Sequence, residues 1–203
     1  MKLPSPNSLK SAMTACAALL VLGCSALPAN QQEGADARGG APWLALSPAA
    51  LGCAAAVQQR LSVTPPGESP RELDALLEVD TTALRLALLN MGQMVGTLSW
   101  DGAHLEPQLS RWWPAQLKPE QVLSDLQLAF WPEDAIAKAL PAPWTLMAAA
   151  SGERVLLRNG TPHVRVRSVS PDALEIVYER GGWTLRVDTP GGSQLCTRER
   201  SAS

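Results

Sequence analysis

Two blocks of alternating apolar and polar residues constrain the fold of this chain. In residues 73–80, apolar side chains fall on one side of an extended strand and acidic side chains on the other. A side-chain period of two in short runs, separated by Gly, Pro, Asn and Asp turns, is typical of an antiparallel sheet with one apolar face. The pattern predicts strands at 55–63, 73–80, 83–90, 93–102 and 104–111, and then at 145–149, 154–158, 163–169, 173–178 and 183–188.

The apolar positions of these strands predict which side chains face the core. We expect inward-facing residues in the first block at Leu73, Ala75, Leu77, Val79, Leu84, Leu86, Leu88, Met94, Leu98 and Trp100. In the second block, charged residues alternate with Val164, Val166, Ile176 and Tyr178. The charges should therefore face solvent, at Arg165, Arg167, Glu175 and Glu179.

Residues 118–140, between the two blocks, have a helical period instead. Pro119 suits the first turn of a helix and Glu120 is favourable near its positive end. Pro132 divides the segment into two short helices. The first helix has an apolar stripe at Val122, Leu123, Leu126 and Phe130, and the second has Ile136 and Leu140. We predict a mainly β (α+β) fold, an incomplete antiparallel barrel with a short helical lid inserted in mid-chain.

The first 23 residues predict an export signal. Lys2 and Lys10 precede an apolar run, Ala12–Leu22, that is shorter than the roughly 20 residues of a membrane-spanning helix. Val21-Leu22-Gly23-Cys24 resembles a bacterial lipobox, in which cleavage leaves a lipid-modified cysteine, here Cys24. Cleavage at a nearby Ala-x-Ala site with a free cysteine is the alternative. Ser25, rather than Asp, after the cysteine indicates the outer membrane, on its periplasmic face.

The predicted organisation is a signal peptide at 1–23, a flexible tether at 24–42, one domain at 43–198 and a tail at 199–203. Without the signal, 15 basic and 19 acidic residues remain, a net charge of −4. This charge argues against nucleic acid and against a polybasic contact with anionic lipid. The tether is rich in Gly, Ala and Pro and has little apolar surface to bury.

Two cysteines, Cys53 and Cys196, remain near the two ends of the predicted domain. A single pair in an exported protein predicts a disulfide. A redox or metal role would usually bring CxxC spacing or neighbouring histidines, and this sequence has neither.

No catalytic constellation stands out in the sequence, so we expect neither an enzyme nor a cofactor. His104 and His163 have no partners at metal-ligand spacing, and there is no GxSxG motif. Asp125, among leucines, could be a general base, but it more often accepts hydrogen bonds from its neighbours. The apolar inventory is unusual, because seven tryptophans accompany one Phe and one Tyr. Those around the helical insert, Trp112, Trp113, Trp131 and Trp144, either fill a core or line an open apolar cavity.

Three stretches carry a resemblance to a known family: residues 51–62, "LLNMGQMVGTLSWDG" at 88–102 and especially "VLSDLQLAFWP" at 122–132. Together they resemble a domain-of-unknown-function family of bacterial lipoproteins, similar to the outer-membrane acceptor LolB and its periplasmic relative LolA. The resemblance implies a half-open barrel with a helical lid and an interior that takes lipid acyl chains. Members often accompany genes for aryl polyene pigments, which implies a lipid-linked cargo.

LolB has an exposed hairpin leucine that engages the membrane, and Met91 in "NMG" matches it, without the preceding proline. We therefore expect a monomeric, non-catalytic lipoprotein that buries a hydrophobic or lipid-linked cargo and hands it to the outer membrane. A LolA-like periplasmic carrier is a possible partner. The expected cavity residues are Leu86, Leu88, Leu98, Trp100, Leu123, Leu126, Phe130 and Trp131. The alternatives are an assembly lipoprotein whose barrel is packed and a lipid hydrolase, which would need a polar triad that the sequence does not show.

Overall fold

A ten-stranded antiparallel sheet dominates the computed structural model, which describes residues 40–115, 117–192 and 194–196. The predicted signal peptide, Cys24, most of the tether and the tail lie outside these residues. The strands are β1 (Ala55–Thr64), β2 (Arg71–Val79), β3 (Leu84–Asn90), β4 (Gln93–Trp100), β5 (Leu105–Leu109), β6 (Trp144–Ala148), β7 (Arg154–Arg158), β8 (Thr161–Ser170), β9 (Ala173–Tyr178) and β10 (Thr184–Asp188).

Two short helices, α1 (Pro119–Phe130) and α2 (Glu133–Ala139), lie between β5 and β6 in the chain. A 3₁₀ helix, η1 (Pro48–Leu51), precedes β1. The predicted fold class is confirmed: the protein is mainly β, and its antiparallel sheet is not closed. Predicted and observed strand bounds differ most at β2, β4, β5 and β8, each of which has one end two residues from the predicted one.

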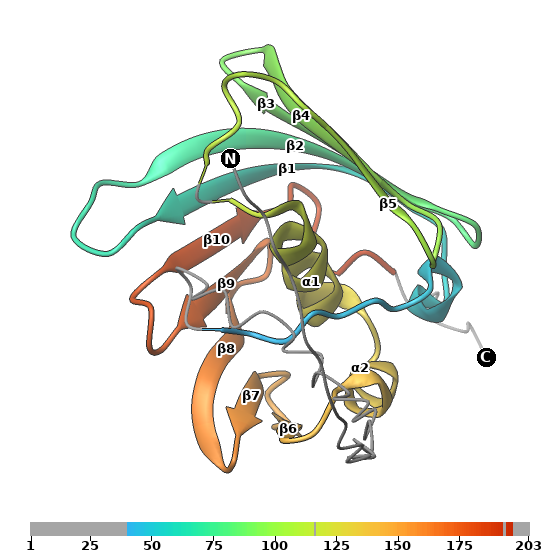
Figure 1. The fold of residues 1–203 in the computed structure, drawn as a ribbon, viewed down its shortest axis with the longest axis vertical. Coiled ribbons are helices and arrows are strands. Elements are labelled where there is room, and N and C mark those ends of the chain that lie inside the picture. The colour runs from blue at the N-terminus through green and yellow to red at the C-terminus, as the bar shows by residue number, and fades with distance from the viewer. Residues whose placement is uncertain (1–39, 116, 193, 197–203) are drawn as a thin grey trace, which may run out of the picture. The chain divides into compact units, whose positions relative to one another are not determined.

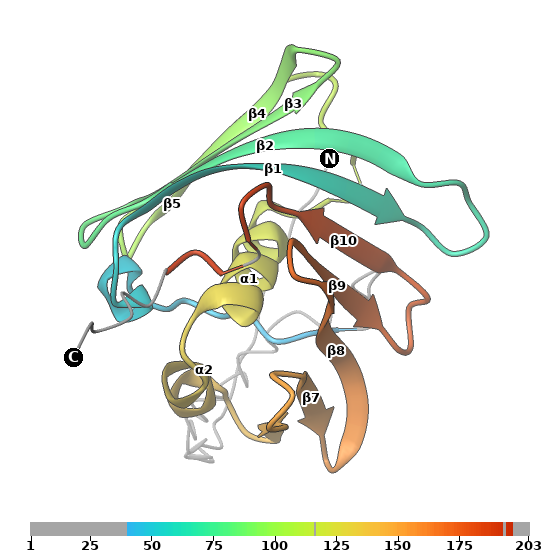
Figure 2. The same cartoon turned by 180° about the vertical axis from the view of Figure 1, so that it is seen from behind.

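The sheet consists of two five-stranded meanders joined by the first and last strands. The strand order is β5-β4-β3-β2-β1-β10-β9-β8-β7-β6, so β1 pairs with β10, with Arg60 opposite Asp188. The sheet curves around α1, which lies on its concave side (Figures 1 and 2). β5 and β6 are the free edges, and Pro107 is tolerated in β5 because an edge strand need not donate every ladder hydrogen bond.

A β-bulge in β4 overturns one sequence-based expectation. Leu88 pairs with Gly96 while Leu89 pairs with Met94, so Val95 is an extra residue in β4. The bulge turns Val95 into the core and reverses the facing of the residues before it. The prediction that Met94 faces inward with Leu98 and Trp100 is therefore wrong, and Met94 is half exposed.

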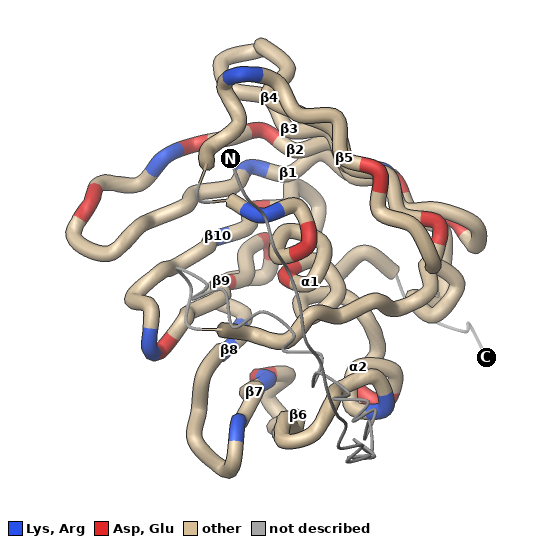
Figure 3. The backbone as a smooth tube through the Cα atoms, in the orientation of Figure 1, with Lys and Arg blue, Asp and Glu red and all other residues tan. Residues whose placement is uncertain are grey.

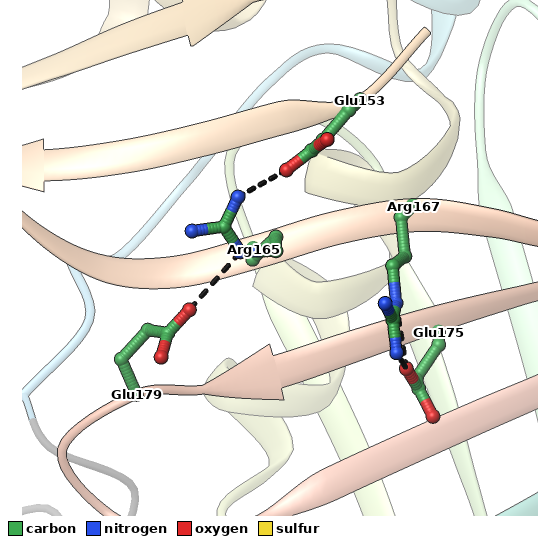
Figure 4. A network of polar contacts seen from close by, with 5 residues as sticks. All are labelled: Glu153, Arg165, Arg167, Glu175 and Glu179. Atoms are coloured by element: carbon green, nitrogen blue, oxygen red, sulfur yellow. Dashed lines mark hydrogen bonds and ion pairs between the residues drawn. The ribbon is translucent and has the colours of Figure 1, made fainter. Parts of the chain in front are cut away.

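The outer face of β8 and β9 carries the predicted charges. The Arg165 guanidinium contacts Glu153 and Glu179, and these hydrogen bonds raise the pKa of Arg165 (Figure 4). Arg167 bonds Glu175 across the two strands at 2.6 Å. The intervening residues Val164, Val166, Ile176 and Tyr178 are buried, as predicted. This face of the second meander is therefore a solvated surface.

A disulfide joins Cys53, just before β1, to Cys196, after β10, with the two Cα atoms 5.9 Å apart. These are the two cysteines whose pairing the sequence predicts. The bond lies just beyond the β1–β10 pair and encloses 143 residues of sequence separation. A cross-link over so long a loop restricts the unfolded chain and thereby favours the folded state.

We expect the double variant Cys53→Ser, Cys196→Ser to lose about 2–5 kcal/mol of unfolding free energy, the usual cost of removing a native disulfide. Urea denaturation followed by circular dichroism measures the loss. Reductant should lower the stability of the wild type to a similar extent and leave the double variant unchanged. Equal midpoints for the two proteins under oxidising conditions would contradict a stabilising role.

Candidate functional site

The helix α1 covers the concave face of the sheet and has two different buried sides. Val122, Leu123 and Leu126, on its apolar stripe, are buried, whereas Phe130 is only partly buried. At its C-terminal end, Arg154 from β7 donates to the carbonyl oxygens of Leu128 and Ala129 at 2.8 and 3.0 Å. Burial lowers the pKa of this guanidinium, and Glu133, 3.6 Å away, opposes that effect. The arginine thus satisfies carbonyls that a helix terminus leaves open.

The second buried side of α1 is polar and holds the segment 41–47, which we call the strap. The strap crosses α1 before entering η1 (Figure 1). The Leu44 N–H donates to Ser124 Oγ at 3.0 Å. The Gln127 amide accepts from the Leu46 N–H and donates to the Leu46 carbonyl, each at 3.0 Å. Two side chains of α1 therefore replace the strand partners that the strap lacks.

Two of the predicted cavity tryptophans also bind the strap. Trp100 Nε1 donates to the Leu46 carbonyl at 2.7 Å, and Trp131 Nε1 donates to the Ser47 carbonyl at 3.0 Å. Trp43 of the strap packs edge-on against Trp100, with ring centroids 5.9 Å apart. The indoles of Trp100 and Trp131 can be buried because the single N–H donor of each finds a backbone acceptor. Trp100 and Trp131 thus fasten the N-terminal segment to the core.

Asp125 lies on α1, facing β9. Its Oδ1 accepts hydrogen bonds from the Tyr178 hydroxyl and from Gln121 Nε2, the latter at 2.9 Å, and Gln121 Nε2 also contacts Tyr178. This arrangement agrees with the interpretation of Asp125 as a hydrogen-bond acceptor. It also fixes the position of α1 on the second meander.

A small apolar cavity lies between α1 and the inner faces of the central strands. Its volume is about 40 Å³, enough for a few water molecules and far below the roughly 300 Å³ of a small ligand pocket. Four of the eight predicted cavity residues line it, namely Leu86, Leu88, Leu126 and Phe130. The other four, Leu98, Trp100, Leu123 and Trp131, are buried in the core but are not among its lining residues.

The polar lining of this cavity comes from Asp125 and Gln59. Gln59 is on β1 and 1% exposed, and its Nε2 donates to Thr189 Oγ1 at 3.0 Å. Its Oε1 has no hydrogen-bond partner among the described residues. The cavity therefore combines leucine-rich walls with an incompletely bonded amide.

A larger groove of about 280 Å³ opens at the rim of the sheet. Val63, Leu73 and Leu117 line both this groove and the inner cavity, and we call these three residues the neck. The outer part of the groove carries the charged side chains Glu68, Arg71 and Glu72. The groove and the cavity are therefore continuous in their lining, with a charged outer end and an apolar inner end.

One wall of the groove is the rim loop, residues 110–115 and 117. Trp113 packs so closely on Gly96 that a Cβ at that position would lie 2.8 Å from the indole, and its Nε1 donates to the Leu117 carbonyl. Gly96 is thus needed for the close approach of the loop. The neighbouring Trp112 is 62% exposed, with the Arg111 guanidinium 4.6 Å from its ring centre, and it lines the groove.

The β3–β4 hairpin stands beside the groove and presents apolar side chains to solvent. Met91, at its tip, is 94% exposed. Met91 and Gly92 both have a positive φ and together form a tight two-residue turn. Met91, Met94 and Trp112 line a common hollow. Residues 86–100 contain no charged side chain (Figure 3). We call Met91, Met94 and Trp112 the apolar tip.

The two histidines lie apart from these features. His104 is in the turn before β5, beside Asp101, and His163 is on β8, with its ring 5.0 Å from the Trp144 ring. In the described residues, no three His, Cys, Asp or Glu side chains are close enough to share a metal ion. Nor does this part of the chain contain a helix that is long and apolar enough to cross a membrane.

The sequence-based reasoning missed Gln59, the neck and the exposure of Trp112. Gln59 carried a usable signal, because it occupies an inward position in the alternation Val57, Gln59, Leu61. The neck could not be predicted, since Val63, Leu73 and Leu117 come from three separate elements. The pair Trp112-Trp113 offers no signal for which ring faces solvent, which the close contact with Gly96 decides.

We expect Gln127→Met to lower the free energy of unfolding by about 2–3 kcal/mol, because it leaves the buried Leu46 N–H without its acceptor. Urea denaturation provides the measurement. Gln108→Met, the same change at an exposed position in β5, is the matched control and should stay within about 0.5 kcal/mol of wild type. Equal effects of the two substitutions would show that the strap contributes little to stability.

Comparison with protein families assigns the chain to a family whose description names no activity. The model of a family described as a protein of unknown function, DUF3261, matches residues 56–190, from β1 to just past β10. A search of curated proteins found no match. The matched region contains β2 to β10, all of β1 except Ala55, both α-helices, the neck and the residues that line the inner cavity. The chain belongs to the DUF3261 family.

Proposed function

We propose that this protein is an outer-membrane-anchored periplasmic lipoprotein that binds an acyl chain or lipid-linked amphiphile and transfers it to the membrane. The observation that supports this proposal most directly is the continuity of the rim groove with the apolar cavity through the neck. An amphiphile has the same polarity gradient as this path, with a polar head and an apolar chain. Neither binding nor release needs a covalent step or a cofactor.

The neck sets the direction in which a chain would enter. The head would stay at the outer end, near Glu68, Arg71 and Glu72, while the chain would pass the neck toward Leu86, Leu88 and Leu126. Burial contributes about 0.8 kcal/mol per methylene, so a dozen methylenes can offset the cost of ordering the chain.

The inner cavity must widen before a chain fits, and the packing indicates where. The strap and Arg154 hold α1 on its outer side and at its C-terminal end, whereas Leu117 and the rim loop precede α1 at the groove. Phe130 and Leu73 are only partly buried, unlike the core leucines. Loading would therefore separate the rim loop and the start of α1 from β1 and β2.

Anchoring by acylated Cys24 would keep the carrier at the membrane that receives the cargo, since several acyl chains bind far more firmly than one. The apolar tip would make the contact through which cargo leaves. This role is comparable to that of LolB, which the sequence resembles, and a LolA-like periplasmic protein would be a suitable donor. A lipid-linked aryl polyene is one cargo that the resemblance suggests.

A second candidate function rests on the small volume of the inner cavity. About 40 Å³ of space also fits a packed core, and such a protein would be an assembly lipoprotein that binds another envelope protein. Native mass spectrometry of the protein purified from its own periplasm separates the two functions. A co-purifying lipid or polyene of defined mass supports the carrier, and a bare protein that takes up no added fatty acid supports the scaffold.

We expect Leu73→Arg to weaken the binding of hexadecanoic acid at least 10-fold, because it places a charge in the apolar neck. The binding is measured by titration of the full chain carrying Cys24→Ser, which removes the attached lipid. Leu76→Arg is the matched control, three residues along the same strand on its outer face and 45% exposed, and should leave binding unchanged. Equal losses in both variants would contradict entry through the neck.

For the apolar tip, we expect Met91→Glu to reduce cargo delivery to vesicles several-fold while binding in solution is unchanged. A carboxylate at a membrane-contacting position must be desolvated, which opposes insertion. Met147→Glu, on edge strand β6 and 53% exposed, makes the same change elsewhere and should deliver normally. Unchanged delivery by Met91→Glu would rule out a membrane contact at this hairpin.

A further inference from the structure

The amide of Gln59 is poorly suited to a packed core. It lies on the concave face of β1, in line with Val57 and Leu61, and directly opposite Ala75 of β2. Its Nε2 donates a hydrogen bond to Thr189 Oγ1, and its Oε1 has no hydrogen-bond partner within the described residues. A buried polar atom without a partner destabilises a fold, and such atoms are uncommon in native structures.

The side chain of Gln59 borders the inner cavity. Ala75, the residue opposite Gln59, also lines the inner cavity, and both side chains are almost fully buried in its narrow form. The remaining polar residue of the cavity, Asp125, already accepts from Tyr178 and Gln121. The cavity is therefore the place where Gln59 Oε1, an acceptor, can meet a hydrogen-bond donor.

We propose that Gln59 is a specificity-determining residue that hydrogen-bonds a hydroxyl group at the buried end of the cargo chain. This inference rests on the proposed carrier function and narrows its cargo to chains that end in a hydroxyl, aliphatic or phenolic. A hydroxyl both donates and accepts a hydrogen bond. It therefore satisfies whichever amide atom of Gln59, Oε1 or Nε2, does not bond Thr189. A chain that ends in a methyl group leaves the amide unpaired.

Water is the competing partner once the cavity widens, because Gln59 has almost no accessible surface in the narrow cavity. A plain acyl chain that entered the cavity would displace such a water without replacing its hydrogen bond, which weakens binding. A hydroxylated chain would replace that bond. In an ordinary apolar pocket the order is reversed, because the hydroxyl loses its hydration and gains nothing. Tighter binding of the hydroxylated chain therefore indicates a hydrogen bond to Gln59, and weaker binding indicates an ordinary apolar pocket.

The experiment compares dodecanoic, tetradecanoic and hexadecanoic acids with their ω-hydroxy counterparts by calorimetric titration of the full chain carrying Cys24→Ser. At the chain length that reaches Gln59, we expect the hydroxylated acid to bind roughly 5- to 10-fold more tightly, the value of about 1–1.4 kcal/mol for one added hydrogen bond. Gln59→Met should abolish this preference and bind the plain acid at least as tightly as wild type does.

A second variant keeps Gln59 in place. Ala75→Ser puts a hydroxyl directly opposite the amide, within the protein, and should remove the preference for hydroxylated chains by satisfying Gln59 internally. Weaker binding of the hydroxylated acid at every length, or a preference that persists in both variants, would overturn the inference and leave the carrier function intact. Binding of no acid by the wild type would overturn the carrier function and the inference with it.

Discussion

The pairing of β1 with β10 is the contact on which the rest of the fold depends. Each five-stranded meander is built from local hairpins, but only this pair, between segments about as far apart as the chain allows, joins them into one curved sheet. Long-range pairing of this kind must offset a large loss of chain entropy. The disulfide between Cys53 and Cys196 lies at the ends of the same two strands and reduces that loss in the unfolded chain. The concave face that receives α1 spans both meanders and therefore includes this pair.

The helix α1 then has the central position, because each of its sides binds a different part of the chain. Its apolar stripe covers the sheet, Asp125 bonds the second meander through Tyr178, and Ser124 and Gln127 hold the strap. Polar residues in the middle of a buried helix would be costly without these partners. Together with Arg154 at its C-terminal end, these contacts hold α1 on the sheet, and the rim groove lies at its N-terminal end. Any widening of the cavity would therefore begin at that groove.

The proposed carrier function combines three features that lie close together. The neck links a groove with charged side chains to a leucine-lined cavity, the apolar tip stands next to the groove, and the uncharged stretch 86–100 supplies both the cavity wall and the tip. Gln59 adds a chemical preference inside that cavity. In this arrangement, affinity comes from apolar burial, while selectivity comes from Gln59 Oε1, for which the described residues provide no partner.

Local pattern determined much of this structure. The period of two predicts the strands to within two residues at each end, and the helical period at residues 118–140 with Pro132 predicts the two helices. The charged outer face of β8 and β9 and the cysteine pair also follow from the sequence. Met94 could not be placed, because a bulge depends on the pairing of two strands and not on the alternation within one. The sequence predicts Trp100 and Trp131 as cavity residues, and the structure adds that their indole N–H groups donate to carbonyl groups of the strap. The neck, the orphaned oxygen of Gln59 and the volume of the cavity were likewise decided by tertiary structure, since each depends on how closely side chains from separate elements approach.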